Sequence, residues 1–369
     1  MWPESSEQAQ PLRTGFTTGT CATACSVACV SSLFTQQLPA QVSVTLPKGK
    51  TVELTVNAEI ISTQSARAST IKDAGDDPDI THGAKIWVEL TLTTNPGVYF
   101  IAGEGVGSVT KAGLLLDVGE PAINPVPRKM ISENLQKVAQ NYRYGGGFKV
   151  TIGVENGAAL ALKTMNPRLG IIGGLSILGT SGIVRPYSCA AWIASIYQTI
   201  DVAHANAVNH LAATTGSTSE KTVKNHYAMP DSSLIEMGDF VGALLKHLKK
   251  VAVPALTICG GFGKITKLAN NAMDLHSRVS QIDFQHLSDI AASIGASREL
   301  QQQIQQANTS IEALSLCQAQ HIPLGDAICQ SALTVCLSRL DNTELEIIAV
   351  DRRGNRVGRA ASQRFEEVL

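Results

Sequence analysis

Apolar and polar residues alternate along the first half of the chain in a pattern typical of strands with one buried face. Strands are expected over residues 42–46, 52–61, 66–71, 86–93, 98–102 and 148–154. The first two flank a turn-like Pro-Lys-Gly-Lys sequence and indicate a hairpin. Helices are expected over residues 21–34 and from Arg128 to about Asn141. This order of elements predicts an α+β domain over residues 1–190.

In the second half, apolar segments alternate with helical periods and glycine-containing turns. Strands are expected over residues 207–213 and 252–259, each followed by a glycine loop and then a helix. Further helices are expected over residues 189–200, 240–249, 285–294, 298–307, 311–320 and 327–340. A last strand covers residues 345–351, and residues 352–360 are interpreted as a polar tail. The succession of strand, glycine loop and helix predicts a Rossmann-like α/β domain over residues 191–369.

A glycine-rich segment, residues 164–188, lies at the end of the first predicted domain. It holds five glycines and eight Leu, Ile or Val residues, and its only charges are Arg168 and Arg185. Glycine is favoured where another group must approach the main chain closely. The planar guanidinium group suits carboxylates and phosphates. A ligand-binding segment and an interdomain connection with two surface arginines are both consistent with these residues.

The composition excludes some classes of protein. With 44% hydrophobic residues, 17% charged residues and a net charge of −1, the chain lacks the basic surplus of a general nucleic-acid binder. No run of 18 apolar residues predicts a membrane span, and the polar N-terminus does not have the pattern of a signal peptide. The eight cysteines are scattered, so we expect reduced thiols and a cytoplasmic location. Cys21, Cys25 and Cys29 share one helical face and are interpreted as packing residues.

Residues 13–20, RTGFTTGT, join a Thr- and Gly-rich loop to the first predicted helix. Hydroxyl groups and free N–H groups at the positive end of a helix dipole would suit an anion. A plain N-cap by Thr18 or Thr20 explains the same sequence more simply. The segment is therefore a candidate anion site with a structural alternative.

Residues 72–83, KDAGDDPDITHG, place four aspartates beside one lysine and one histidine. Asp, Gly and Pro are ordinary turn residues, but this density of charge exceeds the needs of a turn. Oxygen-rich loops can hold Ca²⁺ or Mg²⁺, although this spacing is not that of an EF-hand, and we expect no metal role. The candidate catalytic residues are Asp76, Asp77, Asp79 and His82.

A GxGxxTK pattern occurs twice, at residues 105–111 and 261–267, each time after a predicted strand. Neither copy is a Walker A sequence, and neither completes the GxGxxG pattern of a dinucleotide site. We interpret the glycines of both copies as facing a ligand.

Six segments occur in an order that closely resembles the cobalt-precorrin-5B (C1)-methyltransferase family of cobalamin biosynthesis. They are RTGFTTGT, KDAGDDPDITHG, GEGVGSVTKAGL, GEPAINPVPRKMI, NPRLGIIGGLSILGTSGIVRP and GGFGKITKLA. The likeness extends from about Leu12 to the helices near residue 320, and it is strongest from Arg13 to Pro186.

The resemblance implies an activity and a set of ligands. The reaction is methyl transfer from S-adenosylmethionine to C1 of cobalt-precorrin-5B, giving cobalt-precorrin-6A, on the oxygen-independent route. The substrate is an anionic corrinoid that carries the cobalt itself, and transient contact with neighbouring pathway enzymes is implied. The implied substrate-binding residues are Arg13, Thr17, Thr18, Thr20, Lys72, Asn124, Arg128, Asn166, Arg168 and Arg185. The implied donor-binding residues are Gly260, Gly261, Gly263 and Lys264.

Two other functions remain open from the residues themselves. A non-catalytic or diverged tetrapyrrole-binding protein would keep the anion-binding half without a working donor site. A nucleotide-dependent enzyme would use the GGFGK segment for phosphates. The first would bind a corrinoid but not S-adenosylmethionine, whereas the second would bind ATP or NAD.

Overall fold

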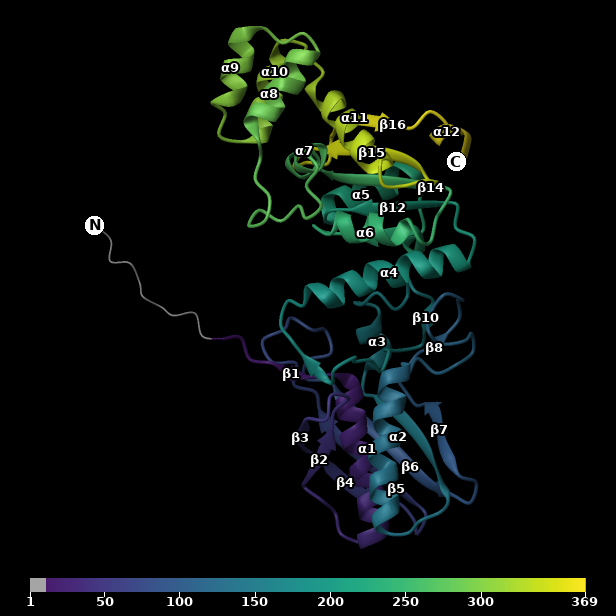
Figure 1. Cartoon of the computed structure of the whole chain (residues 1–369). Coiled ribbons are helices and arrows are strands. Elements are labelled where there is room, and N and C mark those ends of the chain that lie inside the picture. The colour runs from purple at the N-terminus through teal and green to yellow at the C-terminus, as the bar shows by residue number, and fades with distance from the viewer. Residues whose placement is uncertain (1–10, 369) are drawn as a thin grey trace, which may run out of the picture. The chain divides into compact units, whose positions relative to one another are not determined.

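The computed structural model describes residues 11–368 and divides into two compact units (Figure 1). Unit 1 is Met1–Cys189, and unit 2 is Ala190–Leu369. Most of the polar N-terminal segment lies outside the described residues.

Unit 1 is built on a five-stranded sheet and a separate hairpin. Its longer strands are β2 Gln41–Thr45, β3 Thr51–Thr55, β4 Asn57–Ile60, β5 Ser65–Ile71, β6 Lys85–Thr93, β7 Gly97–Ala102 and β9 Gly147–Val154. The sheet order is β4-β5-β6-β9-β7, antiparallel except between β7 and β9. In β5, alternate residues are buried, as the period of the sequence predicts. The predicted hairpin is confirmed as β2 and β3, but its second arm ends at Thr55 and β4 joins the larger sheet.

Two long helices, α1 Thr18–Thr35 and α2 Pro125–Asn141, pack together in unit 1, and α1 also lies against the sheet. Within the described residues, α1 is the one helix long and apolar enough to cross a membrane, yet 83% of that stretch is buried inside the fold. The thiol of Cys25 donates to the carbonyl of Ile86 at 3.6 Å. Cys21, Cys25 and Cys29 are all buried in the core, which confirms the predicted packing role, and burial raises the pKa of the Cys25 thiol well above its usual value.

In unit 1, loops lie at the N-terminal ends of α1 and α2 and are hydrogen-bonded to both. Two short antiparallel ladders and α3 Gly157–Ala161 organise these loops. The ladders pair β1 Gly15–Phe16 with β11 Ile183–Val184, and β8 Ser108–Val109 with β10 Ile171–Ile172. Gly105 has a φ of 76°, and a Cβ there would lie 2.0 Å from the carbonyl oxygen of Val154. This glycine of the repeated pattern therefore serves close backbone packing.

Unit 2 contains a second five-stranded sheet, in which the chain order reverses. Its strands are β12 His210–Thr214, β13 Leu234–Glu236, β14 Ala255–Gly261, β15 Glu344–Val350 and β16 Arg356–Ala361. The sheet order is β13-β12-β14-β15-β16, and only β16 is antiparallel. The chain passes from β12 to β13 on one side and then to β14 on the other side. The strand order thus changes direction between β12 and β14.

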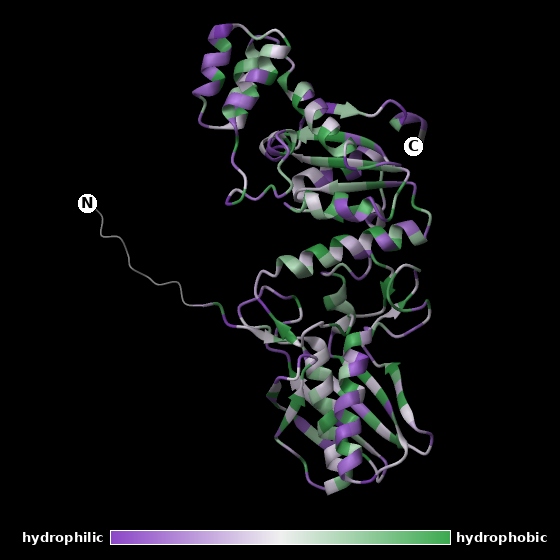
Figure 2. Ribbon diagram, viewed as in Figure 1, coloured by the Kyte–Doolittle hydropathy of each residue, from purple (hydrophilic) through white to green (hydrophobic). Residues whose placement is uncertain are grey.

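Unit 2 contains helices on both faces of this sheet and a further group of helices. The helices are α4 Cys189–Ala205, α5 Ser217–Tyr227, α6 Val241–Leu248, α7 Phe262–Ala269, α8 Phe284–Ser293, α9 Arg298–Gln305, α10 Ser310–Ala319, α11 Leu324–Leu337 and α12 Phe365–Val368, with a 3₁₀ turn at Asp231–Ser233. The further group, α8 to α10, packs on itself and on α7 and α11 (Figure 1). α5 packs on one face through Val223, whereas α6, α7 and α11 pack on the other. In Figure 2, α9 is largely hydrophilic, while the strands of this sheet are largely hydrophobic.

Two expectations for the second half are wrong. The predicted glycine loop after β14 does not exist as a loop, because Gly260 and Gly261 end the strand and α7 begins at Phe262. The predicted polar tail contains β16. Arg359 in this strand donates from Nε to Glu346 Oε1 at 2.6 Å, and that carboxylate is fully buried. Arg356 and Arg359 therefore belong to an edge strand, and Arg359 neutralises a buried acid.

Candidate functional site

The predicted hydroxyl groups at the start of α1 are engaged inside unit 1. Thr17 is the N-cap, and its Oγ1 accepts from the N–H of Thr20 at 3.2 Å. Thr18 Oγ1 accepts from the N–H of Leu178 at 2.9 Å, and Thr20 Oγ1 donates to the carbonyl of Gly182 at 2.7 Å. All three threonines are buried. These contacts tie the helix start to the glycine-rich segment.

Two cations near the acidic loop are paired with its aspartates. Arg13 forms an ion pair with Asp73, which lowers the pKa of that carboxyl group to about 2 through the hydrogen bond from the guanidinium. Lys72 is 1% exposed, and its Nζ donates to Asp79 Oδ2 at 2.6 Å. Thr81 donates to the other oxygen of Asp79 from both its N–H and its hydroxyl. Lys72 and Asp79 thus form a largely internal pair.

The other candidate catalytic residues lie closer to solvent. Asp76 is exposed and accepts from the N–H of Arg13 at 2.6 Å. Asp77 accepts from the N–H of Tyr187 at 2.9 Å, which joins the acidic loop to the glycine-rich segment. His82 Nδ1 accepts from a backbone N–H at 3.1 Å, so the ring proton of the neutral form is on Nε2. His82 and Asp76 are therefore the candidates with exposed side chains.

Arg128 and Asn166 are also held by the fold. Arg128 donates from Nε to the carbonyl of Ile123 at 2.7 Å and lies 3.2 Å from Glu120 Oε2. Asn166 is buried and bonds the carbonyl of Gly174 at 3.1 Å. Both side chains therefore stabilise loops by donating to backbone carbonyl groups.

The remaining predicted residues differ in their surroundings. Asn124 is the N-cap of α2, but its side chain makes no capping hydrogen bond. Arg168 is partly buried and engaged in an interaction. Arg185 is exposed and has no ion-pair partner among the described residues.

We refer to residues 103–124 and 165–187 as the loop face of unit 1. Its exposed apolar side chains are Leu115, Val118, Ile172, Leu178 and Tyr187.

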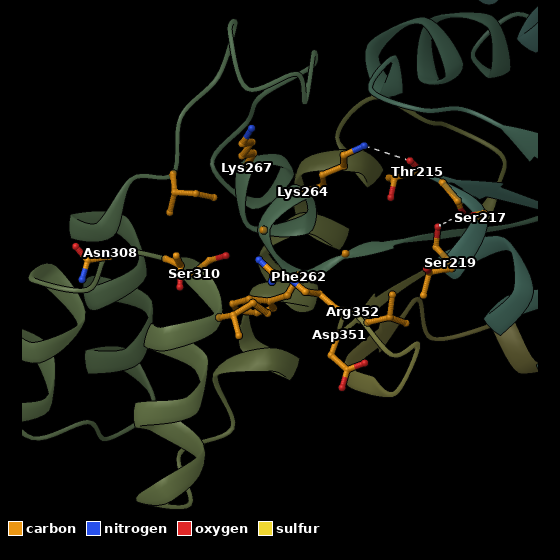
Figure 3. Close-up of a pocket in the computed structure, with 18 residues that line it drawn as sticks. Thr215, Ser217, Ser219, Phe262, Lys264, Lys267, Asn308, Ser310, Asp351 and Arg352 are labelled. Carbon is orange, nitrogen blue, oxygen red and sulfur yellow. Dashed lines mark hydrogen bonds between the residues drawn. The ribbon is translucent and has the colours of Figure 1, made fainter. Parts of the chain in front are cut away.

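Unit 2 holds a cavity of about 730 Å³ beyond the carboxyl ends of its parallel strands (Figure 3). We call it the crevice. Its lining residues come from the starts of α5, α7 and α10 and from the end of β15: Thr215–Ser219, Gly261–Lys264, Lys267, Ile282, Asn308–Ile311 and Val350–Arg352. In open α/β sheets, ligands bind where the strand order reverses, and the crevice lies at the β12–β14 reversal.

Glycines at the crevice leave space that a side chain would fill. Gly216 and Gly261 are the N-caps of α5 and α7, and a Cβ at either would meet no atom within 4 Å. Neither helix start is capped by a side chain. By contrast, a Cβ at Gly260 would lie 2.8 Å from Thr215, and one at Gly263 would lie 3.0 Å from a serine hydroxyl. Of the predicted donor glycines, Gly261 is thus the one beside open volume.

The cations of the crevice are not equally available. Lys264 donates to the carbonyl of Thr215 at 3.1 Å (Figure 3). It also lies 3.0 Å from Asp239. The buried Lys267 donates to the carbonyl of Leu275 at 2.9 Å. Arg352, just beyond β15, is exposed and has no ion-pair partner in the part of the chain that the structure describes. Arg352 has no distinguishing signal in the sequence, where it is the first residue of the expected polar tail.

Metal ligands do not gather at either place. Among residues 11–368, no group of three or more His, Cys, Asp or Glu side chains is arranged to hold a metal ion.

Both parts of the chain match known proteins. The CbiD family model matches residues 5–186, and the model of the CbiD C-terminal domain matches residues 274–361. A "Cobalt-precorrin-5B C(1)-methyltransferase" of Marinomonas sp. (strain MWYL1) is 58% identical over 373 residues, covering 98% of this chain and 97% of that protein. A protein of the same name from Pseudomonas putida (strain GB-1) is 57% identical, covering 98% of this chain and all of that one.

A solved structure is also similar. It is the crystal structure of a cobalamin biosynthesis protein (cbiD) from Archaeoglobus fulgidus, with 31% sequence identity and a TM-score of 0.39. The match covers 68% of this chain and 78% of that chain. With relatives above 50% identity along nearly its whole length, this chain belongs to the CbiD family.

Proposed function

We propose that this protein transfers the methyl group of S-adenosylmethionine to C1 of cobalt-precorrin-5B, giving cobalt-precorrin-6A on the oxygen-independent cobalamin route. The observation that carries the proposal is the identity of 57–58% with cobalt-precorrin-5B C(1)-methyltransferases over 98% of the chain. Both units lie within the aligned length, so the parts for donor and acceptor belong to the same chain.

The crevice of unit 2 is the proposed site of S-adenosylmethionine. Its place at the reversal of strand order supports this, and so does the open volume at Gly216 and Gly261. S-adenosylmethionine has no phosphate groups, so the glycines would serve close approach rather than phosphate binding. We accordingly propose a Rossmann-like α/β domain over residues 191–369 and an α+β domain over residues 1–190.

The loop face of unit 1 is the proposed site of the anionic corrinoid. Arg185 supplies an uncompensated cation, and Ile172 and Leu178 expose apolar surface to a flat ring. Asn124, whose side chain makes no capping bond, offers an amide group. His82 and Asp76 are exposed in the acidic loop, which contacts the loop face through the hydrogen bond from Tyr187 to Asp77. The cobalt belongs to the substrate in this proposal.

The chemistry requires positioning more than acid–base groups. The substrate carbon supplies the electron pair for the new C–CH₃ bond, and the S–CH₃ bond breaks with its pair returning to sulfur. Because the sulfonium makes the methyl group reactive, alignment of the two centres and electrostatic support can provide most of the catalysis. The corrinoid then loses one proton to solvent, so the products are the methylated corrinoid, which has gained CH₂ overall, S-adenosylhomocysteine and a proton.

The direct test is to incubate the purified protein with S-adenosylmethionine and cobalt-precorrin-5B. We expect the corrinoid to gain one CH₂ in mass and S-adenosylhomocysteine to appear in equal amount. Corrinoid binding without S-adenosylmethionine binding in calorimetry would favour a tetrapyrrole-binding protein instead. Binding of ATP or NAD in place of S-adenosylmethionine would favour a nucleotide-dependent enzyme.

We also place the reaction in the cytoplasm, with transient contact to neighbouring pathway enzymes. The family membership supports both statements, because the substrate and product must pass between successive biosynthetic enzymes. Cell fractionation with an antibody to the protein tests the location.

A further inference from the structure

Lys264 connects the two walls of the crevice. It lies in the first turn of α7, and its ammonium donates to the carbonyl oxygen of Thr215, 3.1 Å away beyond β12. The same ammonium lies 3.0 Å from Oδ1 of Asp239, in the turn after β13. One side chain thus joins the segments that follow three neighbouring parallel strands.

Asp239 depends on this lysine. Its Oδ1 is buried and has no hydrogen-bond partner among the described residues, and the 3.0 Å contact with Lys264 is an ion pair without the alignment of a hydrogen bond. A buried carboxylate oxygen without a counter-charge is strongly unfavourable. Without the ammonium, the turn that carries Asp239 would lower its free energy by moving toward solvent, where water can hydrate the carboxylate.

Thr215 is fixed from the other side as well. Its N–H donates to the carbonyl of Cys259 at 3.1 Å. Gly260 leaves room for its side chain, since a Cβ there would lie 2.8 Å from Thr215 Cγ2. With its carbonyl held by Lys264, Thr215 determines where the chain enters the turn that places Gly216 across from α7.

We propose that Lys264 is a positioning residue that sets the width of the crevice between Gly216 and Gly261 and does not bind the donor. Its charge is already compensated by a carboxylate and a carbonyl group. This role replaces the expectation that Lys264 faces the donor, and it leaves Arg352 as the uncompensated cation of the crevice. The proposal rests on the assignment of the crevice to S-adenosylmethionine.

Two ligands separate positioning from direct contact. S-adenosylhomocysteine carries the amino-acid carboxylate, whereas 5′-methylthioadenosine lacks it. Lys264→Met should weaken both ligands by the same factor, about tenfold, because a distorted crevice affects every part of the ligand. Lys264→Arg should restore part of the affinity, and Lys246→Met, which changes an exposed lysine of α6, should change neither. Loss confined to S-adenosylhomocysteine, or no loss at all, would overturn the proposal.

Asp239→Asn provides a second variant in which the lysine remains. It should weaken both ligands together, as Lys264→Met does, and the double variant should lose little more than either single one. If the lysine instead binds the donor carboxylate, Asp239→Asn would free its ammonium, and S-adenosylhomocysteine would bind as well or better. That result would overturn the proposal even if Lys264→Met folds poorly.

Hydrogen exchange of the ligand-free protein tests the same role without any donor. Lys264→Met should speed amide exchange over residues 215–219 and leave α11 unchanged. Unchanged exchange at these residues would overturn the positioning role, whatever the crevice binds. If exchange is faster in Lys264→Met but the wild-type protein binds neither S-adenosylhomocysteine nor 5′-methylthioadenosine, the donor assignment is rejected and the positioning role stands.

Discussion

The loop face of unit 1 and the crevice of unit 2 both contain glycine-rich segments, but their candidate ligand-binding residues lie in different surroundings. On the loop face, side chains such as Asn166 and Ser176 are buried and hydrogen-bonded within the fold. In the crevice, an added Cβ at Gly216 or Gly261 would meet no atom within 4 Å, and neither glycine has the left-handed φ that accounts for Gly119 and Gly173, the open glycines of the loop face. Polar residues in a recognisable motif can therefore be architectural, and residues without side chains can mark where a ligand fits.

The largest expected effect concerns the buried cation of unit 1. Lys72→Met should lower the free energy of unfolding by about 3 kcal/mol, since breaking a buried ion pair is strongly destabilising and Asp79 is only a quarter exposed. Lys85→Met, which removes a half-exposed lysine 3.8 Å from Glu155, should change it by less than about 0.5 kcal/mol. Denaturant unfolding measures both. Normal stability with weakened corrinoid binding would make Lys72 a ligand residue and break the contrast between the regions.

Gly261→Val tests the open volume of the crevice. The added side chain should weaken S-adenosylmethionine binding by about 100-fold and leave corrinoid binding nearly intact, because it fills ligand space without displacing protein atoms. Gly145→Val is the matched control, since a Cβ at Gly145 in unit 1 also meets nothing within 4 Å. Calorimetry with each ligand measures the effect. An unchanged donor dissociation constant would move the donor elsewhere, and residues 214–219 would be the next candidates.

Two arginines of unit 1 sharpen the comparison within one region. Arg185→Ala should weaken corrinoid binding by about 1.5 kcal/mol without lowering the melting temperature, as expected for an exposed cation that meets a substrate carboxylate. Arg128→Ala should mainly lower the melting temperature, because its guanidinium holds the carbonyls of Ile123 and Pro121. The opposite result for the pair would mean that the exposed arginine is incidental.

Acid should affect unit 2 before unit 1. Burial lowers the pKa of His210 to about 4, below its unfolded value of 6.5, so the unfolded chain binds more protons between these values. Stability from this group is complete above pH 6.5 and falls as the pH drops toward 4, by about 1 kcal/mol after allowance for partial exposure of the ring. Asp73 of unit 1, with a pKa of about 2, loses its contribution only below about pH 3.8.

Amide hydrogen exchange, measured on peptides from each unit, shows which unit opens first as the pH falls. His210→Gln should remove the loss in unit 2 between pH 6.5 and 4. If unit 1 opens first on acidification, the assignment of the acid-sensitive group is wrong.

Local patterns in the sequence were sufficient for many elements. The strands near residues 66–71, 86–93 and 148–154, and the helix that ends at Asn141, agree with the structure because period and turn residues determine them locally. β16 is not apparent from the sequence, because an edge strand tolerates arginines. Arg359 in this strand forms an ion pair with the buried Glu346, 13 residues earlier in the chain. The glycines that end β14 have the composition of a loop, because strand ends and loops share the same residues.

The use of side chains was harder to predict than the elements. Thr18 and Thr20 were identified as candidate ligands, but their partners Leu178 and Gly182 lie about 160 residues further along the chain. Such long-range hydrogen bonds leave no local signal. Arg352 shows the reverse case, since only the sheet brings the end of β15 to the crevice.

The measurement that tests the central claim most directly is photo-crosslinking of labelled S-adenosylmethionine to the wild-type chain, followed by peptide mapping. We expect label in peptides that contain Thr215–Ser219, Gly261–Lys264 or Asn308–Ile311, competed by S-adenosylhomocysteine. Competed label confined to residues 103–124 or 165–187 would place the donor on the loop face and contradict the assignment of the crevice.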